Sequence, residues 1–354
     1  MSLTLELTPE KYNNLSPKDI VRRFVPEFTT FREQKRDSKG NYFYLKDETD
    51  NPTGAYKWRG SAVKLSRLFS DGVGKVVTAS AGNHGQGVAW VSGQMGGCAE
   101  VFVPVGTPAS KLEGLNRLGA TVYQVGSNFD ESTSLAIDYA KSQGNHFVHP
   151  YDDIDVMDGQ GTIADELYLQ MKSNGIYAQD SVVFVPVGGG GLIGGVAKRL
   201  KQLTNNEVKV VGVQVEGSDS AALSFYDSLD CADQKIDGAY RILLENRSTK
   251  STSYVRTKAT SPNNNVDGTR VNIVGKNCME SIIKNVDEFL VISSESLGSF
   301  YKQNPSTRLE PAGALAQVGA DLYSCLPGTQ LQYLISLQTG RNQDKNRIQN
   351  LIDL

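Results

Sequence analysis

The segment whose residue types most suggest chemistry is a run of four glycines at positions 188–191. It follows a β-branched apolar stretch, 182–187, and helical character resumes at 196–200. Glycines at a strand-to-helix junction let the backbone approach a ligand closely, and the unpaired N–H groups of a helix start point at an anion. A purely structural turn would lose much backbone entropy in four glycines. The run therefore predicts a phosphate-binding turn.

The same glycines also fit a dinucleotide site. Gly189, Gly191 and Gly194 match the pattern G-x-G-x-x-G after a strand, and Glu216 stands at the end of the next predicted strand. Dinucleotide-binding folds place an acidic ligand of the ribose at such a position. The glycines alone thus leave open which phosphorylated cofactor is bound, and an NAD-dependent oxidoreductase is one alternative.

A single lysine, Lys57, lies in the second chemically suggestive segment, which spans residues 51–60. It follows a Pro/Gly turn at the predicted start of a helix, and its neighbours Tyr56 and Trp58 could screen an amine from water. Desolvation and the polarity of a helix start both lower the pKa of a lysine, as a Schiff-base lysine requires. The alternative interpretation is a surface lysine that extends its amine into solvent.

The third segment, residues 78–87, is another predicted strand-to-helix corner. Its small residues expose backbone N–H groups in a nest that suits a carboxylate. Ser80 and Asn83 can add hydrogen bonds from their side chains. His84 is open to two interpretations, a general base or a structural partner of the helix start.

Taken in this order, the three segments resemble the fold-type II pyridoxal-phosphate enzymes, and within them the group of threonine ammonia-lyase (threonine dehydratase) and serine racemase. The resemblance covers most of the chain. It includes further short motifs at 46–49, 107–111, 119–120, 149–153, 159–162, 215–221, 266–268 and 309–314. Each motif is common by itself, but their order is specific.

The resemblance implies pyridoxal 5′-phosphate as the cofactor and assigns roles to individual residues. Lys57 would form the Schiff base with the cofactor and later act as the base at the substrate Cα. Gly188, Gly189, Gly190, Gly191 and Leu192 would surround the phosphate of the cofactor. Tyr56, where the family usually has Phe, would lie near the ring, with Gly268 and Glu310 along it. Asn83 would bind the 3′ oxygen, and Thr339 would bind the pyridine nitrogen. The substrate carboxylate would be bound, largely through backbone amides, by Ser80, Ala81, Gly82, Asn83 and His84.

Two of these positions bear on the reaction. A hydroxyl partner such as Thr339 does not enforce protonation of the ring nitrogen as a carboxylate would, and this favours β-elimination over transamination. Ala81 stands where the racemases carry a serine that protonates the opposite face of Cα, and an alanine cannot transfer a proton. We therefore expect a lyase that deaminates a β-hydroxy amino acid, threonine or serine, to a 2-oxo acid and ammonia. Because 53–57 and 339–340 also resemble threonine synthase, β- or γ-replacement is the alternative within this chemistry.

The elements that must position these residues alternate between strands and helices. Strand-like runs at 75–79, 99–104, 120–125, 182–187 and 208–215 alternate with helix-like runs such as 110–118 and 131–142. This alternation is typical of parallel βα units in an α/β fold. The resemblance implies two domains, each with a central, mostly parallel sheet, and the cofactor in the cleft between them. We expect a small domain at residues 53–152 and a large cofactor-binding domain made of 1–52 and 153–354, with a polar surface segment at 246–265.

Composition narrows the class of protein. With 354 residues, of which 39% are hydrophobic and 21% charged, the chain is typical of a soluble protein with a large core. The net charge of −3 gives no reason to expect binding to nucleic acid or to an anionic membrane. No run approaches the roughly 18 apolar residues that span a bilayer, and the N-terminal residues lack the pattern of a secretory signal.

The cysteines and acidic residues predict neither a disulfide framework nor a metal site. Cys98, Cys231, Cys278 and Cys325 are far apart and form no CxxC pair. The segment 216–219 does not reproduce the metal ligands of the racemases. We expect a cytoplasmic enzyme without a metal ion, acting on a small amino acid as a homodimer.

Overall fold

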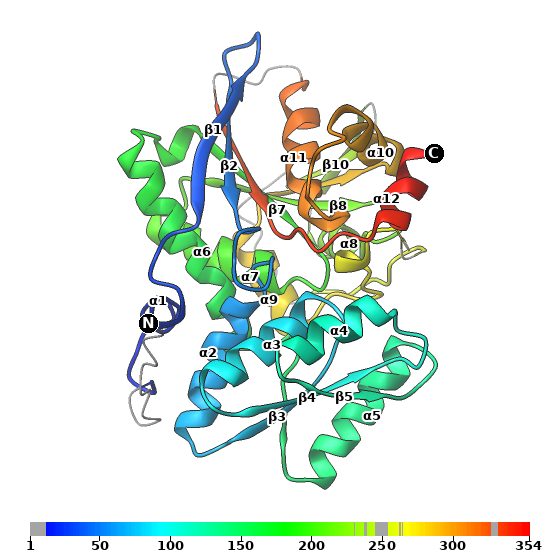
Figure 1. The fold of residues 1–354 in the computed structure, drawn as a ribbon. Coiled ribbons are helices and arrows are strands. Elements are labelled where there is room, and N and C mark those ends of the chain that lie inside the picture. Colours follow the sequence, from blue (N-terminus) through cyan, green and yellow to red (C-terminus); the bar gives the residue numbers. More distant parts are fainter. Residues whose placement is uncertain are drawn as a thin grey trace. The chain divides into compact units, whose positions relative to one another are not determined.

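The computed structural model describes residues 12–229, 231–236, 239–244, 254–261, 263, 265–326 and 332–354. The chain divides into two compact units, a smaller one of Met1–Glu27 with Lys57–Gln160 and a larger one of Phe28–Tyr56 with Gly161–Leu354 (Figure 1). No helix within the described ranges combines the length and apolarity needed to cross a membrane. Residues 1–11, which lack the pattern of a secretory signal, lie outside the described residues. So do positions 246–253, 262 and 264 of the expected surface segment.

The smaller unit is built on a four-stranded parallel sheet with the strand order β5-β4-β3-β6. Its strands are β3 (Lys75–Ala79), β4 (Cys98–Val103), β5 (Thr121–Gln124) and β6 (His146–Phe147). Its helices are α1 (Pro17–Phe24), α2 (Trp58–Ser70), α3 (Asn83–Gln94), α4 (Ala109–Arg117), α5 (Phe129–Ser142) and the start of α6 (Ile154–Ser173). The strands predicted at 75–79, 99–104 and 120–125 and the helices predicted at 110–118 and 131–142 are found within two residues of their expected ends.

The smaller unit has its main core on one face of this sheet. Trp58, Leu65 and Val91 of α2 and α3 pack there with Val101 of β4. Ile20 of α1 is buried in the same cluster. This burial explains why residues 12–27 group with the smaller unit, whereas we expected the N-terminal segment in the large domain.

The first turns of α6 also belong to the smaller unit, which extends to Gln160 and not to 152 as expected. A Cβ atom built on Gly159 would lie 2.5 Å from the carbonyl oxygen of Arg59 and 2.6 Å from the Cα of Gly60. The backbones of α2 and α6 therefore touch at these glycines, a contact that the alternation of strands and helices does not reveal.

The larger unit contains an eight-stranded sheet with the order β1-β2-β12-β7-β8-β11-β10-β9 (Figure 1). The strands are β1 (Thr30–Arg36), β2 (Tyr42–Asp47), β7 (Ser181–Pro186), β8 (Lys209–Val215), β9 (Cys231–Ile236), β10 (Ala239–Leu244), β11 (Glu288–Ile292) and β12 (Tyr333–Gln338). The central strands from β2 to β11 run parallel, whereas β1 at one edge and β10 and β9 at the other are antiparallel. The predicted α/β fold with mostly parallel sheets is confirmed.

Helices cover both faces of this sheet. They are the rest of α6, α7 (Gly191–Leu203), α8 (Ser220–Ser228), α9 (Lys276–Asn285), α10 (Ser294–Gln303), α11 (Pro311–Ser324) and α12 (Lys345–Ile352), with short 3-10 turns at η2 (Ala178–Asp180) and η3 (Asp267–Thr269). Val213 of β8 lies against Gly319 of α11, where an added Cβ would come within 2.9 Å of it. The neighbouring Gly212 faces Ile193 of α7 in the same way, at 3.0 Å. Adjacent residues of one strand thus meet helices on opposite faces, as the alternation of side chains along a strand requires.

One helix boundary differs from the sequence prediction. Helix α7 begins at Gly191, five residues before the helical character read from the sequence at 196. Gly194 lies inside the helix, and its carbonyl accepts a hydrogen bond of 2.7 Å from the hydroxyl of Ser281 in α9. Glycine is a poor helix former, but here packing against α9 overrides that preference.

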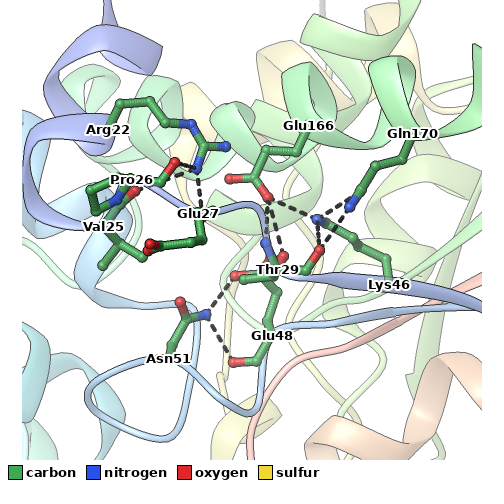
Figure 2. A network of polar contacts seen from close by, with 10 residues as sticks. All are labelled: Arg22, Val25, Pro26, Glu27, Thr29, Lys46, Glu48, Asn51, Glu166 and Gln170. Carbon is green, nitrogen blue, oxygen red and sulfur yellow. Dashed lines mark hydrogen bonds and ion pairs between the residues drawn. The ribbon is translucent and has the colours of Figure 1, made fainter. Parts of the chain in front are cut away.

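A buried ion pair fixes the first strands of the larger unit to α6 (Figure 2). The Lys46 amine lies 2.8 Å from a carboxylate oxygen of Glu166, and both side chains are at most 2% exposed. The same amine donates to the side-chain oxygen of Gln170 at 2.9 Å and to the carbonyl of Thr29 at 3.0 Å. The Thr29 hydroxyl in turn donates to Glu48 at 2.6 Å. Each charge is therefore both paired and hydrogen-bonded, which is the condition for burying it without a large penalty.

We predict that Lys46→Met lowers the free energy of unfolding by about 3–5 kcal/mol, because it leaves a buried carboxylate without its counter-ion. Urea-induced unfolding measures the change. Lys35→Met is the matched control: Lys35 pairs with Asp321 at 2.6 Å, but its side chain is 47% exposed, and its loss should cost about 1 kcal/mol or less. Equal losses in the two variants would contradict a special role for the buried pair.

Candidate active site

Each unit places its predicted site residues at the carboxyl edge of a parallel sheet. In the larger unit, β7 leads into Gly188, and the neighbouring strand β12 leads into Thr339. In the smaller unit, β3 leads into Ser80, and the neighbouring strand β6 leads towards His149. Ligands of open α/β sheets bind outside the carboxyl ends of the strands. The sheet topology therefore places both sets of residues at the carboxyl ends of strands, where ligands of such sheets bind.

The predicted phosphate turn joins β7 to α7. Gly190 is the N-cap of α7 and has a φ of +96°, in the left-handed region that favours glycine. The N–H groups of Gly191 and Leu192 lie in the first turn of α7, where the helix provides no acceptor for them. A left-handed residue followed by a helix start forms a nest of N–H groups that suits a phosphate.

The turn is held in place by its surroundings. The carbonyl of Gly189 accepts a hydrogen bond of 3.1 Å from the N–H of Gly275. A Cβ built on Gly190 would lie 2.7 Å from the Cβ of Cys278. One built on Gly188 would lie 3.1 Å from the carbonyl oxygen of Gly268. The structure thus brings the predicted residue Gly268 against the glycine turn.

The segment that precedes Lys57 lies against the end of β12, within the larger unit. The N–H of Tyr56 donates to the carbonyl of Thr339 at 3.2 Å, and Ala55 forms an isolated antiparallel bridge with Gly340. The N–H of Glu310 donates to the carbonyl of Gly340 at 3.1 Å. A Cβ on Gly340 would collide with a carboxylate oxygen of Glu310. Tyr56, Glu310 and Thr339, three residues far apart in the sequence, are therefore brought together.

The phenol groups of Tyr56 and Tyr301, near the carboxylate of Glu310, remain protonated. Burial raises the pKa of Tyr56, and the negative charge of Glu310 raises it further. The same two causes raise the pKa of Tyr301, whose hydroxyl donates to the carbonyl of Leu309 at 2.9 Å. Tyr56 can therefore donate a hydrogen bond but cannot act as a base.

Lys57 lies in the smaller unit, directly before α2, of which it is the N-cap. Its side chain is half-buried, and its amine donates a hydrogen bond of 3.2 Å to the carbonyl of Pro150. The next residue, Trp58, is fully buried and packs edge-to-face on Trp90, with the ring centroids 5.5 Å apart. The partial positive charge of the helix start disfavours an ammonium at this position. The amine is thus directed by a specific acceptor and is not a freely solvated surface group.

The predicted carboxylate corner lies between β3 and α3. The hydroxyl of Ser80 accepts the N–H of Gly82 at 3.2 Å, and α3 begins at Asn83. A Cβ on Gly85 would collide with the carbonyl of Ser80, so this turn requires a residue without a side chain at position 85. Residues 80–83 are half-buried, and the first N–H groups of α3 have no acceptor within the helix. Ser80, Ala81, Gly82 and Asn83 thus form one short corner that could receive a carboxylate.

His84 is neutral and buried beneath this corner. Its Nε2 lies 3.2 Å from the carbonyl of Val148, and since a carbonyl only accepts, Nε2 carries the hydrogen. Burial lowers the pKa of His84 to about 3, and the positive charge of Lys57 contributes. The Thr78 hydroxyl donates to the same carbonyl at 2.9 Å. Of the two interpretations left open, this geometry favours the structural one.

His149 shapes the turn that carries the acceptor of Lys57. Its Nδ1 accepts the N–H groups of Tyr151 at 3.3 Å and Asp152 at 2.8 Å. Burial lowers the pKa of His149 although two nearby aspartates oppose the shift. The neutral ring therefore closes the turn that presents the carbonyl of Pro150.

Sequence reasoning missed three of the residues that build the site. Pro150 belongs to a motif that contributes to the resemblance, but its backbone carbonyl carries no signature in the sequence. Gly275, the N-cap of α9, and Cys278 within α9 support the glycine turn, and no sequence pattern links these two residues to that turn. Such contacts follow from tertiary packing and not from local spacing.

The residues present fit pyridoxal phosphate. The larger unit offers an anion nest at the glycine turn with Glu310 and Thr339 on neighbouring segments, and the smaller unit offers the directed amine of Lys57. The fold and these two sets of groups define the fold-type II pyridoxal-phosphate enzymes. The family described as "Pyridoxal-phosphate dependent enzyme" matches residues 28–324, and the chain belongs to it.

Within this family, the chain is similar to several threonine dehydratases. The chain is 34% identical to the L-threonine dehydratase biosynthetic IlvA of Burkholderia multivorans over 87% of its own length and 56% of that protein. It is 32% identical to the L-threonine dehydratase catabolic TdcB of Staphylococcus aureus, over 96% of this chain and 89% of the relative. The structure of the processed form of threonine deaminase isoform 2 from Solanum lycopersicum is similar with a TM-score of 0.75 and 29% identity, covering 89% of this chain and 79% of that one.

The chain spans about half the length of the biosynthetic relatives that it matches. Membership of the family decides between the two phosphorylated cofactors that the glycine run left open. The cofactor is pyridoxal phosphate, and Glu216 follows β8 without the role of a ribose ligand.

We predict that Gly190→Ala weakens binding of pyridoxal phosphate by at least tenfold. The alanine must adopt a left-handed conformation, which costs about 1–2 kcal/mol, and its Cβ would press on Cys278. Titration of the apoprotein with the cofactor, followed by absorbance, measures the affinity. Gly175→Ala is the control, because Gly175 also has a positive φ of +68° but no atom within 4 Å of the added Cβ. Equal affinity of the two variants for the cofactor would show that the turn is not the phosphate site.

We predict that acid destabilises the protein partly through His84. Its pKa is about 3 when folded, against 6.5 when exposed, so the unfolded chain binds more protons between these pH values. Stability therefore falls as pH drops from 6.5 towards 3, by at most about 1.4 kcal/mol per pH unit for this one group. His84→Gln retains an N–H donor without the titration and should lose stability less steeply. Urea unfolding from pH 7 to 4.5 compares the slopes, and identical slopes would show that His84 is not the titrating group.

Proposed function

We propose that this protein is a pyridoxal-phosphate-dependent ammonia-lyase that converts L-threonine or L-serine to the corresponding 2-oxo acid and ammonia. The observation that carries the proposal is the placement of the Lys57 amine and the corner at 80–84 on one compact unit, in a chain that matches a threonine dehydratase along 96% of its length. A base and a carboxylate anchor are what α-proton removal from an amino acid needs.

Lys57 is the group that takes the proton from the substrate Cα. Bound pyridoxal phosphate supplies an electron sink that makes this proton acidic. The carbonyl of Pro150, 3.2 Å from the amine, accepts one of its hydrogens. This hydrogen bond restricts rotation of the amine about the bond to its side chain.

The corner orients the substrate. The first N–H groups of α3 and the hydroxyl of Ser80 offer donors to a carboxylate, and the helix start favours its negative charge. A carboxylate held there fixes the rotation about the bond to Cα, so that the C–H bond can be presented to the base. Because these donors belong to a packed helix start, little reorganisation accompanies binding.

The corner supplies no acid for the opposite face of Cα. Ala81 has no proton to give, and the hydrogen on Nε2 of His84 is donated to the carbonyl of Val148. The low pKa of His84 keeps its ring neutral at physiological pH. These features support elimination of the β-hydroxyl over inversion at Cα.

We further propose a cytoplasmic location and a homodimer. Cys98 and Cys325 are exposed thiols, as is usual in a reducing compartment. The homodimer is supported by the resemblance to the family.

We expect the purified holoenzyme to release ammonia from L-threonine with 2-oxobutanoate, and from L-serine with pyruvate. Lys57→Ala should lower the rate of ammonia release from both substrates by more than a thousandfold and remove the absorbance band of the bound cofactor. Lys75→Ala, which removes a surface lysine, is the control and should behave as the unchanged protein. Ammonia assays and chromatography of the products measure these outcomes. Exchange of the β-substituent with an added thiol, without ammonia release, would establish the replacement reaction instead, and D-amino acid as the main product would establish a racemase.

A further inference from the structure

Gly87, in α3, touches the backbone of the catalytic lysine. A Cβ built on Gly87 would lie 3.0 Å from the amide nitrogen and 3.1 Å from the Cα of Trp58, and 3.2 Å from the carbonyl carbon of Lys57. These atoms surround the peptide bond that joins Lys57 to Trp58. Helix α3 thus approaches this peptide so closely that even a methyl group would press on it.

The peptide cannot easily retreat, because α6 holds the same turn of α2. A Cβ on Gly159 would lie 2.5 Å from the carbonyl oxygen of Arg59, and one on Gly60 would lie 2.8 Å from the carbonyl oxygen of Val156. Backbone contacts with two helices therefore fix the turn that follows Lys57. Packed backbones transmit a displacement and do not absorb it.

Helix α3 carries the carboxylate corner as well. The helix begins at Asn83, beside Ser80, and Gly87 follows about one turn later. The same rigid element thus supplies the predicted anchor of the substrate at its first turn and a contact with the Lys57 peptide at the next.

We propose that Gly87 is a positioning residue for Lys57. Its missing side chain lets α3 set the place of the lysine backbone, so that one helix fixes both the amine and the carboxylate corner. The placement of Lys57 concerns only the lysine and its cofactor, whereas the role of the corner as the substrate anchor rests on the proposed function. A methyl group at position 87 increases the separation between the Lys57 peptide and α3, so that the amine shifts relative to the corner, while the corner keeps its own geometry within the helix start.

The experiment compares Gly87→Ala with Gly93→Ala. Both substitutions replace a glycine of α3 and bring the same gain in helix propensity, but a Cβ on Gly93 meets only the carbonyl oxygen of Leu118, at 3.9 Å. We expect Gly87→Ala to weaken the affinity of the apoprotein for pyridoxal phosphate by at least tenfold. We expect it to lower kcat for L-threonine by at least tenfold, since a displacement of about 1 Å can reduce a rate by about a hundredfold, while KM changes less than threefold. Gly93→Ala should stay within twofold in all three quantities.

Circular dichroism and thermal unfolding of the apoproteins accompany these measurements. Equal cofactor affinity in the two variants would overturn the proposal. Loss of the folded apoprotein in Gly87→Ala alone would also overturn it, because Gly87 would then serve the fold as a whole and not the lysine. If neither protein releases ammonia, the lyase proposal fails, but the comparison of cofactor affinities still decides the role of Gly87.

Discussion

Parallel strands end at the same edge of their sheet, and the arrangement of this protein depends on that constraint. Gly188 and Thr339 are far apart in the sequence, but β7 and β12 are hydrogen-bonded neighbours that run in the same direction, so the residues that follow them emerge side by side. The same holds for β3 and β6, which bring Ser80 and the turn of Pro150 to one edge of the smaller sheet. Close backbone contacts at glycines then refine positions that strand direction sets only coarsely.

The two histidines and the tyrosine at these edges are kept uncharged. His84 and His149 are neutral because they are buried and lie near a positive lysine. Burial and the charge of Glu310 keep Tyr56 protonated. The negative charges of the ligand, a phosphate and a carboxylate, are then met by helix starts. Such dipoles are fixed in advance and need no reorganisation when charge develops.

The α/β class and the strands β3, β4 and β5 of the smaller unit could be predicted from the sequence, because β-branched runs and strand-to-helix alternation are local signals. The glycine turn, the position of Lys57 before a helix and the corner at Ser80 could be identified for the same reason. The start of α7 could not, because packing against α9 overrides the low helix propensity of Gly194. The antiparallel edge strand β1 is polar and exposed along most of its length, so it lacks the apolar pattern that predicts a strand. Contacts such as Lys57 with Pro150 join backbone atoms of distant segments and leave no trace in side-chain identity.

The glycine turn has a consequence for the stability of the protein. Glycines lose more conformational freedom on folding than other residues, so the start of α7 is costly to order while its anion nest is empty. A ligand that binds only the folded chain stabilises it by mass action, by about 2.7 kcal/mol at a hundred times its Kd. The stability of the folded chain therefore depends on the concentration of the cofactor as well as on the contacts within the chain.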